Sequence, residues 1–160
     1  MDDKLRSALQ QGALFAVNTL GAERALVVYE GHGLAHGLEA GPAMWLTGEI
    51  STSVLASLLE EREPMVLIDA ANDDRTRDQT SVVLSSLRSV LFVPLPNSAG
   101  RMGGFFYCDN RQKAGVFTDR HLDTALQWLQ NTLCPQLLAA HPAQSPDLTY
   151  EALTQTHWAT

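Results

Sequence analysis

Apolar residues recur at spacings of three and four along two stretches in the first half of the chain. Residues 3–20 carry one such stripe, which is the pattern of a helix that buries a single face. Residues 48–64 carry another, with Ser51 or Ser53 placed to cap the start of a helix and Pro64 placed to end it. The pattern therefore predicts two amphipathic helices, each packed on one side.

A third helical stripe begins near Asp119, directly after Thr118, whose hydroxyl suits a helix N-cap. The stripe continues past Pro135, which lacks a backbone N–H and is expected to kink or break the helix. The residues that follow are mostly polar. We assign residues 1–141 to a single domain and residues 142–160 to a flexible or loosely docked tail, in which one more short helix could form.

Five stretches are rich in the aliphatic, β-branched and aromatic residues that favour strands. They are residues 24–31, 33–38, 65–70, 89–95 and 102–109. The last two are joined by a short loop with Pro, Asn and Gly and without a helix, so this pair is antiparallel. The order of helices and strands favours an α+β fold over a doubly wound parallel sheet.

The second strand of this hairpin has two further features. Gly103 and Gly104 lie inside it, which indicates a bulge or the close approach of another backbone. The strand ends on Tyr107, Cys108 and Asp109. Because side chains alternate along a strand, Tyr107 and Asp109 share one face of the sheet and Cys108 points to the other.

The charge balance restricts the class of partner. The formal net charge is −7 and the sequence pI is about 5.1, and the Lys and Arg residues are scattered. Direct nucleic-acid binding needs clustered Lys and Arg against the phosphates, so it is not expected. The N-terminal residues do not form a signal peptide and no apolar run has the length of a membrane span, so we expect a soluble, cytoplasmic protein.

The cysteines and histidines do not form a motif for metal binding. Cys108 and Cys134 have no CxxC partner, which argues against zinc and favours two reduced, packed thiols, while one disulfide between them stays open. His32 and His36 are four residues apart, but the glycines around them disfavour a helix, so we expect a solvated loop. The sequence therefore indicates no metal and no cofactor.

One succession of motifs over residues 88–129 is specific. A strand ends in Val-Pro-Leu, a second strand carries Gly and ends in Tyr-x-Asp-Asn, and Phe-Thr precedes a helix. This succession resembles the C-terminal half of a GAF domain, of the subtype found in bacterial signalling proteins and transcription activators. Residues 50–75 are similar to the family's helix, Pro and strand ending in Asp-Ala. The positions that match are Val93, Pro94, Leu95, Gly104, Tyr107, Asp109, Asn110, Phe117 and Thr118.

The resemblance covers about residues 3–140 and implies a fold and a function. The fold is a central antiparallel sheet of five or six strands, with short helices over a ligand pocket on one face and the N- and C-terminal helices on the other. The function is a non-enzymatic sensory or regulatory domain that binds an unknown small molecule between the sheet and residues 71–88. The terminal helices would pass the signal to a protein partner. The candidate ligand-binding residues are Asp69, Asp73, Asp74, Ser81, Arg88, Tyr107 and Asp109.

Two of these candidates also have a purely structural interpretation. The planar guanidinium of Arg88 suits a carboxylate or a phosphate, because it donates two hydrogen bonds at once. Arg88 could equally pair with an acid at the surface, and Asp69 could cap a turn. Sequence alone leaves both interpretations open.

Other activities within the family are less well supported by the residues. Cyclic-nucleotide-binding GAF domains carry an Asn-Lys and a later acidic pair, whereas Asn110 precedes Arg111 here and the acidic pair is missing. Reduction of free methionine sulfoxide requires clustered thiols, and Cys108 and Cys134 are predicted on different elements. A bilin-type chromophore is usually attached to a Cys beside a His, and Cys108 has no such neighbour in sequence. We therefore expect no enzymatic activity.

The helical stripes raise the question of a second copy of the chain. A stripe that both covers the sheet and forms a dimer should be wider than one face, and Leu14, Phe15, Trp128 and Leu137 widen it, so a homodimer is favoured. The alternative function is a ligand-free scaffold of the same fold, with the pocket filled by residues such as Val82, Val83, Leu84 and Phe106. The predicted interface residues are Leu5, Leu9, Leu126, Leu129 and Leu133.

Overall fold

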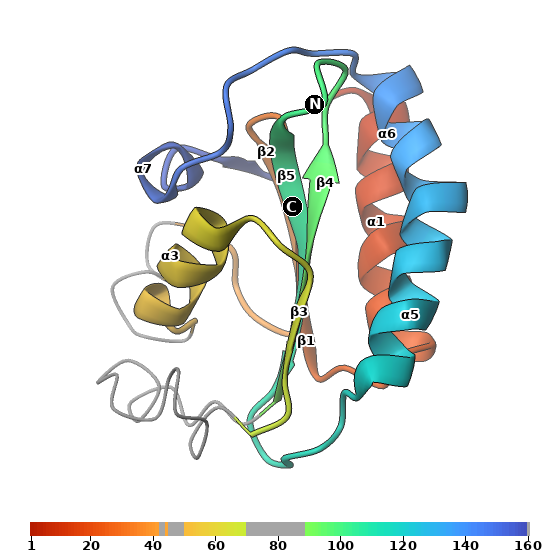
Figure 1. Ribbon diagram of the computed structural model, residues 1–160. Helices are drawn as coiled ribbons and strands as arrows, with labels where there is room; N and C mark the ends of the chain where they lie inside the picture. The colour runs from red at the N-terminus through yellow and green to blue at the C-terminus, as the bar shows by residue number, and fades with distance from the viewer. Residues whose placement is uncertain (42–43, 45–49, 70–88, 160) are drawn as a thin grey trace.

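The protein is built on one six-stranded sheet with helices on both faces (Figure 1). The computed structural model describes residues 1–41, 44, 50–69 and 89–159. The strands follow the order β3-β4-β5-β1-β2-β6 across the sheet, and neighbours are antiparallel except for β2 and β6. The α+β fold with an antiparallel central sheet is thereby confirmed. The strands are β1 (Arg24–Tyr29), β2 (His32–His36), β3 (Met65–Leu67), β4 (Ser89–Pro96), β5 (Met102–Asn110) and β6 (His157–Trp158).

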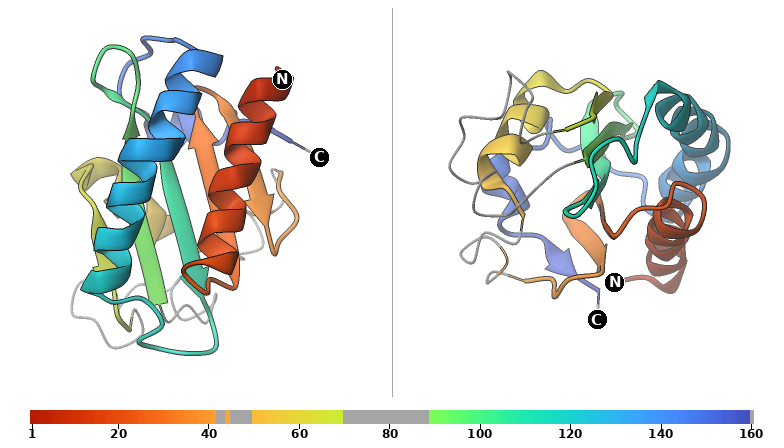
Figure 2. Two further views of the ribbon diagram at one scale, coloured as in Figure 1. Left: turned by 90° about the vertical axis from the view of Figure 1, so that its right-hand side faces the viewer. Right: turned by 90° about the horizontal axis from the view of Figure 1, so that it is seen from below.

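One face of the sheet is covered by α1 (Asp3–Asn18) and by a long helical rod made of α5 (Asp119–Trp128), η1 (Leu129–Leu133) and α6 (Cys134–Ala140). The left view of Figure 2 shows α1 and this rod lying side by side over the sheet. We call this side the helix face. Among the described residues, no helix combines the length and apolar composition that a membrane span requires.

The prediction that Pro135 kinks or breaks the helix is only half right. The rod continues through Pro135 at the start of α6, and the irregularity lies before it, in the π-helical turn η1. Pro135 has no N–H to donate and its ring crowds the carbonyl of the preceding turn. A widened π turn at that point accommodates the ring without ending the helix.

The other face of the sheet packs against α3 (Thr52–Glu61), and we call it the α3 face. The Ser51 hydroxyl accepts a hydrogen bond from the Val54 amide at 3.3 Å, so Ser51 rather than Ser53 caps this helix. The helix ends at Arg62, which adopts a left-handed conformation with φ of 57°, two residues before Pro64. A short helix, α7 (Tyr150–Leu153), lies beside α3 (Figure 1).

Each face of the sheet buries its own apolar cluster, as strand alternation requires. Ala25, Val27 and Phe106 belong to the helix face, and Leu26 and Phe105 belong to the α3 face. Phe106 therefore packs under α1 and does not fill a pocket on the α3 face, as the scaffold interpretation had supposed. The other predicted filling residues, Val82, Val83 and Leu84, lie outside the described residues.

The glycines in β5 do what the sequence indicated. The β4–β5 ladder shifts register so that Leu95 faces Gly104 and Pro96 faces Met102, which leaves Gly103 as the extra residue of a bulge. A Cβ on Gly104 would lie 1.8 Å from the carbonyl oxygen of Val28. Gly104 is thus required because the backbone of β1 passes directly over it.

The structure describes residues 142–159 of the segment that the sequence assigned to a flexible or loosely docked tail. This segment contributes α7 and the edge strand β6, and it buries Leu148 and Leu153 in the cluster of the α3 face. The anticipated short helix is present. The apolar residues of the segment are too few and too irregularly spaced to produce a helix or strand period, so the sequence did not reveal that they are anchors.

Candidate functional site

The polar end of β5 lies in a cross-strand row at one end of the sheet. Leu67 of β3 is opposite Val90 of β4, Val90 is opposite Asp109 of β5, and Asp109 is opposite Arg24 of β1. Tyr107, two residues before Asp109, points to the same face, while Cys108 points to the helix face. The predicted alternation of these side chains is confirmed.

Arg24, Asp109 and Tyr107 form a buried polar triad on the α3 face. The Arg24 guanidinium donates from Nε to Asp109 Oδ1 at 2.8 Å and from Nη2 to Asp109 Oδ2 at 2.7 Å. The Tyr107 hydroxyl donates to Asp109 Oδ2 at 2.5 Å. Arg24 is 1% exposed and Asp109 is fully buried. The ion pair is therefore bidentate and shielded from water, which is the strong form of this interaction.

Burial and charge act together on the protonation of the triad. Burial alone would lower the pKa of Arg24, but the hydrogen bonds and charge of Asp109 raise it. Burial raises the pKa of the Asp109 carboxyl, and the guanidinium of Arg24 opposes this effect. Burial, followed by the charge of Asp109, raises the pKa of the Tyr107 hydroxyl well above its usual value. Tyr107 consequently stays neutral, and its hydroxyl donates a hydrogen bond to the carboxylate.

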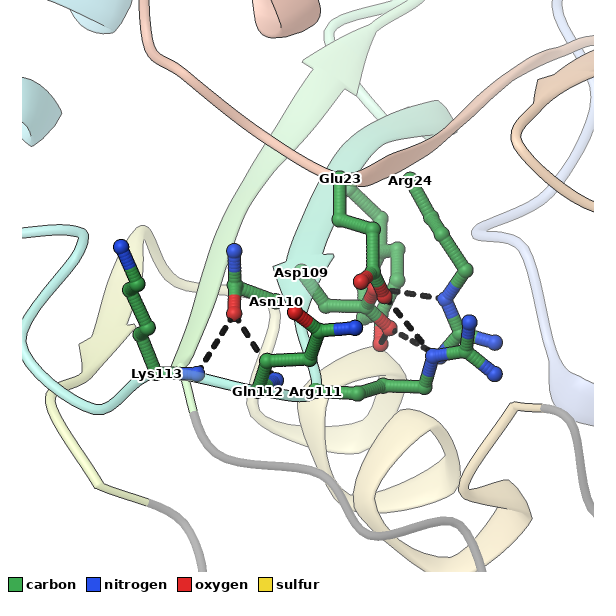
Figure 3. A network of polar contacts seen from close by, with 8 residues as sticks. Glu23, Arg24, Asp109, Asn110, Arg111, Gln112 and Lys113 are labelled. Carbon is green, nitrogen blue, oxygen red and sulfur yellow. Dashed lines mark hydrogen bonds and ion pairs between the residues drawn. The ribbon is translucent and has the colours of Figure 1, made fainter.

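The surroundings of the triad hold the strand ends in place (Figure 3). The Glu23 amide donates to the Asp109 carbonyl at 3.1 Å, and the Glu23 carboxylate pairs with Arg111 at 2.7 Å on the surface. The side-chain carbonyl of Asn110 accepts from the amides of Gln112 and Lys113, at 2.9 and 2.8 Å, and so closes the turn after β5. The motif residues Asp109 and Asn110 thus have different tasks: one holds a buried charge and the other shapes a turn.

Of the sequence-predicted ligand residues, the structure brings Tyr107 and Asp109 into direct contact. Asp69 is half-buried and follows Leu67, which belongs to the cross-strand row of Asp109, so it lies at the same end of the sheet. The remaining candidates lie outside the described residues. These are Asp73, Asp74, Ser81 and Arg88.

The sequence did not identify Arg24 as a candidate site residue. Arg24 was only the first residue of a predicted strand. Arg24 lies 85 positions before Asp109, so only the pairing of β1 with β5 makes them neighbours. One signal was available. Arg24 has the same strand parity as the buried Leu26, and a charge on the buried face of a strand requires a partner.

The triad can orient a ligand or stabilise the fold, but it is poorly suited to proton transfer. Three donors already occupy the Asp109 carboxylate, and neither oxygen is exposed to water.

Cavities of about 350 and 440 Å³ lie at the opposite end of the sheet, and both include Asp147 in their walls. On the α3 face beside the triad, Phe92 stacks on Phe105 within the buried apolar cluster, at a centroid distance of 5.6 Å.

The two cysteines are free thiols set apart on the helix face. Cys108 is fully buried and faces Leu91, whereas Cys134 contributes to a cavity wall that includes Leu95. Cys108 lies in β5, and Cys134 lies in the helical rod at the start of α6. Burial raises the pKa of Cys108 well above its usual value and that of Cys134 to about 11. The described residues also contain no cluster of three or more His, Cys, Asp or Glu side chains able to hold a metal ion.

The leucines predicted at a dimer interface are mostly core residues of the single chain. Leu5, Leu9, Leu129 and Leu133 are at most 1% exposed and pack between the helices and the sheet. A side chain without exposed surface has none left to bury against a second copy, so these four cannot contact a partner directly. Leu126 is partly buried.

The residues that widen the helical stripe also include both buried and exposed side chains. Leu137 is 1% exposed, whereas Leu14 is 42% exposed. Phe15 and Trp128 are half-buried and stack on each other, with ring centroids 4.1 Å apart. Leu14 is therefore exposed on α1, while Phe15 of α1 and Trp128 of α5 keep part of their surface exposed.

Comparison with known proteins identifies the family. The GAF domain model matches residues 4–137. No curated protein matches the chain. A domain of a putative two-component sensor histidine kinase from Sinorhizobium meliloti has a TM-score of 0.57 and 14% identity, covering 87% of this chain and 94% of its own.

Two further solved structures have the same fold. The photoproduct state of GAF3 from a Synechocystis protein has a TM-score of 0.58 and 13% identity, covering 84% of this chain and 97% of its own. Free methionine-R-sulfoxide reductase from Neisseria meningitidis, solved with its substrate, has a TM-score of 0.55 and 16% identity, covering 86% of this chain and 80% of its own. The sheet order, the two helical layers and the family match together establish that this chain belongs to the GAF domain family.

Proposed function

We propose that the protein is a non-enzymatic sensory or regulatory domain that binds a small molecule on the α3 face of the sheet, beside the triad. The observation that carries the proposal is the buried Arg24–Asp109 pair with its Tyr107 partner at the end of this face. Buried charges are costly unless they are paired, and they concentrate where a polar ligand must be held in an apolar setting. Asp69 at the same end, and the sequence-based candidate Arg88, would supply further polar contacts.

Membership of the GAF family supports a sensory role. The fold is similar to that of a sensor histidine kinase domain and to that of a methyl-accepting chemotaxis protein fragment, the latter with a TM-score of 0.57 and 18% identity. The terminal helices cover the opposite face of the same strands, so a ligand that alters β1 or β5 also alters the surface under α1. A ligand that prefers one helix arrangement would shift the population toward it.

The experiment is native mass spectrometry of the freshly purified protein, compared with its denatured mass. We expect a small molecule that dissociates on denaturation. The matched variant replaces the triad with Arg24→Met, Asp109→Leu and Tyr107→Phe, which keeps the volume but removes the charges. Its control is Glu23→Gln with Arg111→Gln, which removes the neighbouring surface pair. Equal ligand occupancy in both variants would exclude the triad from the site.

Arg88→Ala tests the sequence-based candidate directly. We expect this variant to lose bound ligand and to keep the unfolding transition of the unchanged protein, because a ligand-binding arginine contributes to affinity more than to the fold. Unchanged affinity would remove Arg88 from the site.

The buried apolar cluster of the α3 face, in which Phe92 stacks on Phe105, favours a second candidate, an interaction scaffold without a ligand. In that case the chain pairs with a second copy through Leu14, Phe15 and Trp128 and carries no small molecule through purification. Sedimentation of the unchanged protein and of Leu14→Lys tests whether the chain forms a dimer and whether Leu14 contributes to it. A dimer that Leu14→Lys dissociates, with no released mass, would favour the scaffold.

The free methionine sulfoxide reductases of this fold raise an enzymatic alternative. That chemistry needs an attacking thiolate with a resolving thiol close by, whereas Cys108 and Cys134 lie on different elements and both have raised pKa values. We expect no turnover of free methionine sulfoxide with a dithiol reductant. Turnover that is lost in Cys108→Ser or Cys134→Ser would overturn this assignment.

A further inference from the structure

The C-terminal strand β6 is attached to the sheet by few backbone contacts. The His157 amide donates to the Gly31 carbonyl at 2.9 Å, and the Ala159 amide donates to the Gly33 carbonyl at 2.8 Å. The strand pairs with β2 in parallel, and Figures 1 and 2 show it at the edge of the sheet. A two-residue edge strand is too short to be held by its ladder alone. Its attachment therefore depends on its side chains.

The two side chains of β6 lie on opposite faces of the sheet. Trp158 packs against the α3 face, directly over Gly33, where an added Cβ would lie 2.6 Å from the indole ring. His157 lies on the helix face beside His32, which is opposite Tyr29 of the helix-face cluster. One side chain thus fills a recess left by a glycine, and the other joins a second imidazole.

A third histidine completes a cluster at this corner. The His32 ring centroid is 5.4 Å from that of His141 and 6.0 Å from that of His157. His141 stands at the C-terminal end of α6, where the chain leaves the helix layer, and His157 stands where the chain returns to the sheet. The three imidazoles therefore connect β2 to both ends of the C-terminal segment.

The middle imidazole is held in a setting that disfavours a positive charge. His32 is half-buried, and its Nδ1 is buried without a hydrogen-bond partner among the described residues. Burial lowers the pKa of His32, and His141, the amino group of Met1 and His157 lower it further. Protonation of His32 would place a cation next to two other titratable rings.

The other titratable groups around this corner do not offset the cost of a positive charge on His32. The hydroxyl of Tyr29, across the hairpin from His32, has a pKa raised to about 12 by burial and stays neutral. The Asp2 carboxylate at the start of α1 is occupied by the amides of Lys4 and Leu5, and Asp3 follows it in the first turn. The Glu30 carboxylate, in the turn before β2, lies instead against Gly103.

We propose that His32, His141 and His157 form a proton-operated latch that holds β6 against β2 at neutral pH and releases it in mildly acidic conditions. Release would separate Trp158 from Gly33 and expose the backbone edge of β2. The anchors Leu148 and Leu153 lie upstream in the segment and remain docked on the α3 face. The switch is thus confined to the last residues and does not require the domain to unfold.

The direction of the pH effect follows from proton linkage. The docked state has a His32 pKa below the ordinary value of 6.5, so the released state binds more protons. Docking is therefore fully favoured above pH 6.5 and weakens as the pH falls through 6.5. The loss of docking free energy stops increasing once the pH is below the pKa of His32 in the docked state. The ratio of docked to released strand should fall by up to about tenfold per pH unit for each proton taken up.

The test is a ¹⁵N–¹H NMR titration of the full chain from pH 8 to pH 5. We expect the amide signals of His157 and Ala159 and the indole signal of Trp158 to move to the positions of an unstructured chain below pH 6.5. Signals of Val27 and Phe106 in the central strands should stay in place, which separates release from acid unfolding. Gly33→Ala, whose Cβ occupies the space of the indole, supplies the spectrum of the released strand at pH 8.

His32→Gln and His36→Gln form the matched pair of variants. Both lie in β2, but His36 is exposed at the strand end and has no part in the cluster. His32→Gln should keep β6 docked down to pH 5, and His36→Gln should release it as the unchanged protein does. If His32→Gln is already released at pH 8, the double variant His141→Gln, His157→Gln decides: a weaker pH dependence supports the latch. Tail signals that stay docked at pH 5 in the unchanged protein would overturn the proposal. Release of β6 over the same pH range in His32→Gln, or in the double variant, as in the unchanged protein would overturn it as well.

Discussion

The two faces of the sheet are made from the same strands but are stabilised in different ways. On the helix face, Leu9, Ala16 and Leu133 pack against alternate strand residues in a cluster of apolar side chains. On the α3 face, the apolar cluster ends in a buried ion pair between Arg24 and Asp109. An apolar cluster tolerates exchange between side chains of similar volume, whereas an ion pair requires both partners. The difference shows which positions the fold can vary and which it must keep.

Removal of one charge should have the largest effect. Arg24→Ala leaves the Asp109 carboxylate buried without its cation, so we expect a loss of about 3–5 kcal/mol in the free energy of unfolding, measured by urea denaturation. Arg111→Ala is the control, because its pair with Glu23 is partly exposed and contributes about 0–1 kcal/mol.

The apolar replacement of the whole triad completes this test. Arg24→Met with Asp109→Leu and Tyr107→Phe should unfold at nearly the same urea concentration as the unchanged protein, because no unpaired charge is left. A single and a triple variant of equal stability would contradict the interpretation of the pair as a coupled unit.

Conservative exchanges should sharpen the contrast between the faces. Leu9→Met keeps the volume of a fully buried side chain and should cost less than about 1.5 kcal/mol. Arg24→Lys keeps the charge but loses the second of two parallel hydrogen bonds, so we expect a loss of about 1.5–3 kcal/mol. Thermal unfolding of both variants measures the difference, and a more damaging Leu9→Met would reverse the comparison.

A smaller effect is expected where a single hydrogen bond is removed. Tyr107→Phe keeps the ring in the α3-face cluster and deletes the donor to Asp109, so the loss should be about 1–2 kcal/mol. The matched control is Tyr29→Phe on the helix face, whose hydroxyl has no hydrogen-bond partner among the described residues. Urea denaturation should place Tyr29→Phe at or above the stability of the unchanged protein, and a larger loss there than in Tyr107→Phe would contradict this account.

The last prediction concerns the chemical reactivity of the two thiols on the helix face, not the stability of the fold. With a pKa of about 11, roughly one Cys134 in a thousand is a thiolate at pH 8, and Cys108 is fully buried. Thiol labelling at pH 8 should be about 100-fold or more slower in the folded than in the urea-unfolded protein. The labelling rate of Cys134 should rise steadily from pH 8 to pH 10, and rapid labelling at pH 7 would contradict the raised pKa.

Local sequence determined the elements and the face of the sheet to which each side chain points. The helical stripes, the Thr118 position before α5 and the alternation of Tyr107, Cys108 and Asp109 depend on neighbours within a few residues, so they could be predicted. The motif over residues 88–129 likewise indicated the family, because its turn and strand-end residues are local requirements.

Only the tertiary structure decided which distant side chains meet. Arg24 and Asp109 are neighbours because β1 pairs with β5, and His32, His141 and His157 meet because the C-terminal segment returns to the edge of β2. No periodicity marks such contacts, since each depends on the register between strands far apart in the chain. The local sequence thus determines the face of the sheet to which a side chain points, and the order of the strands determines which charged side chain lies beside it.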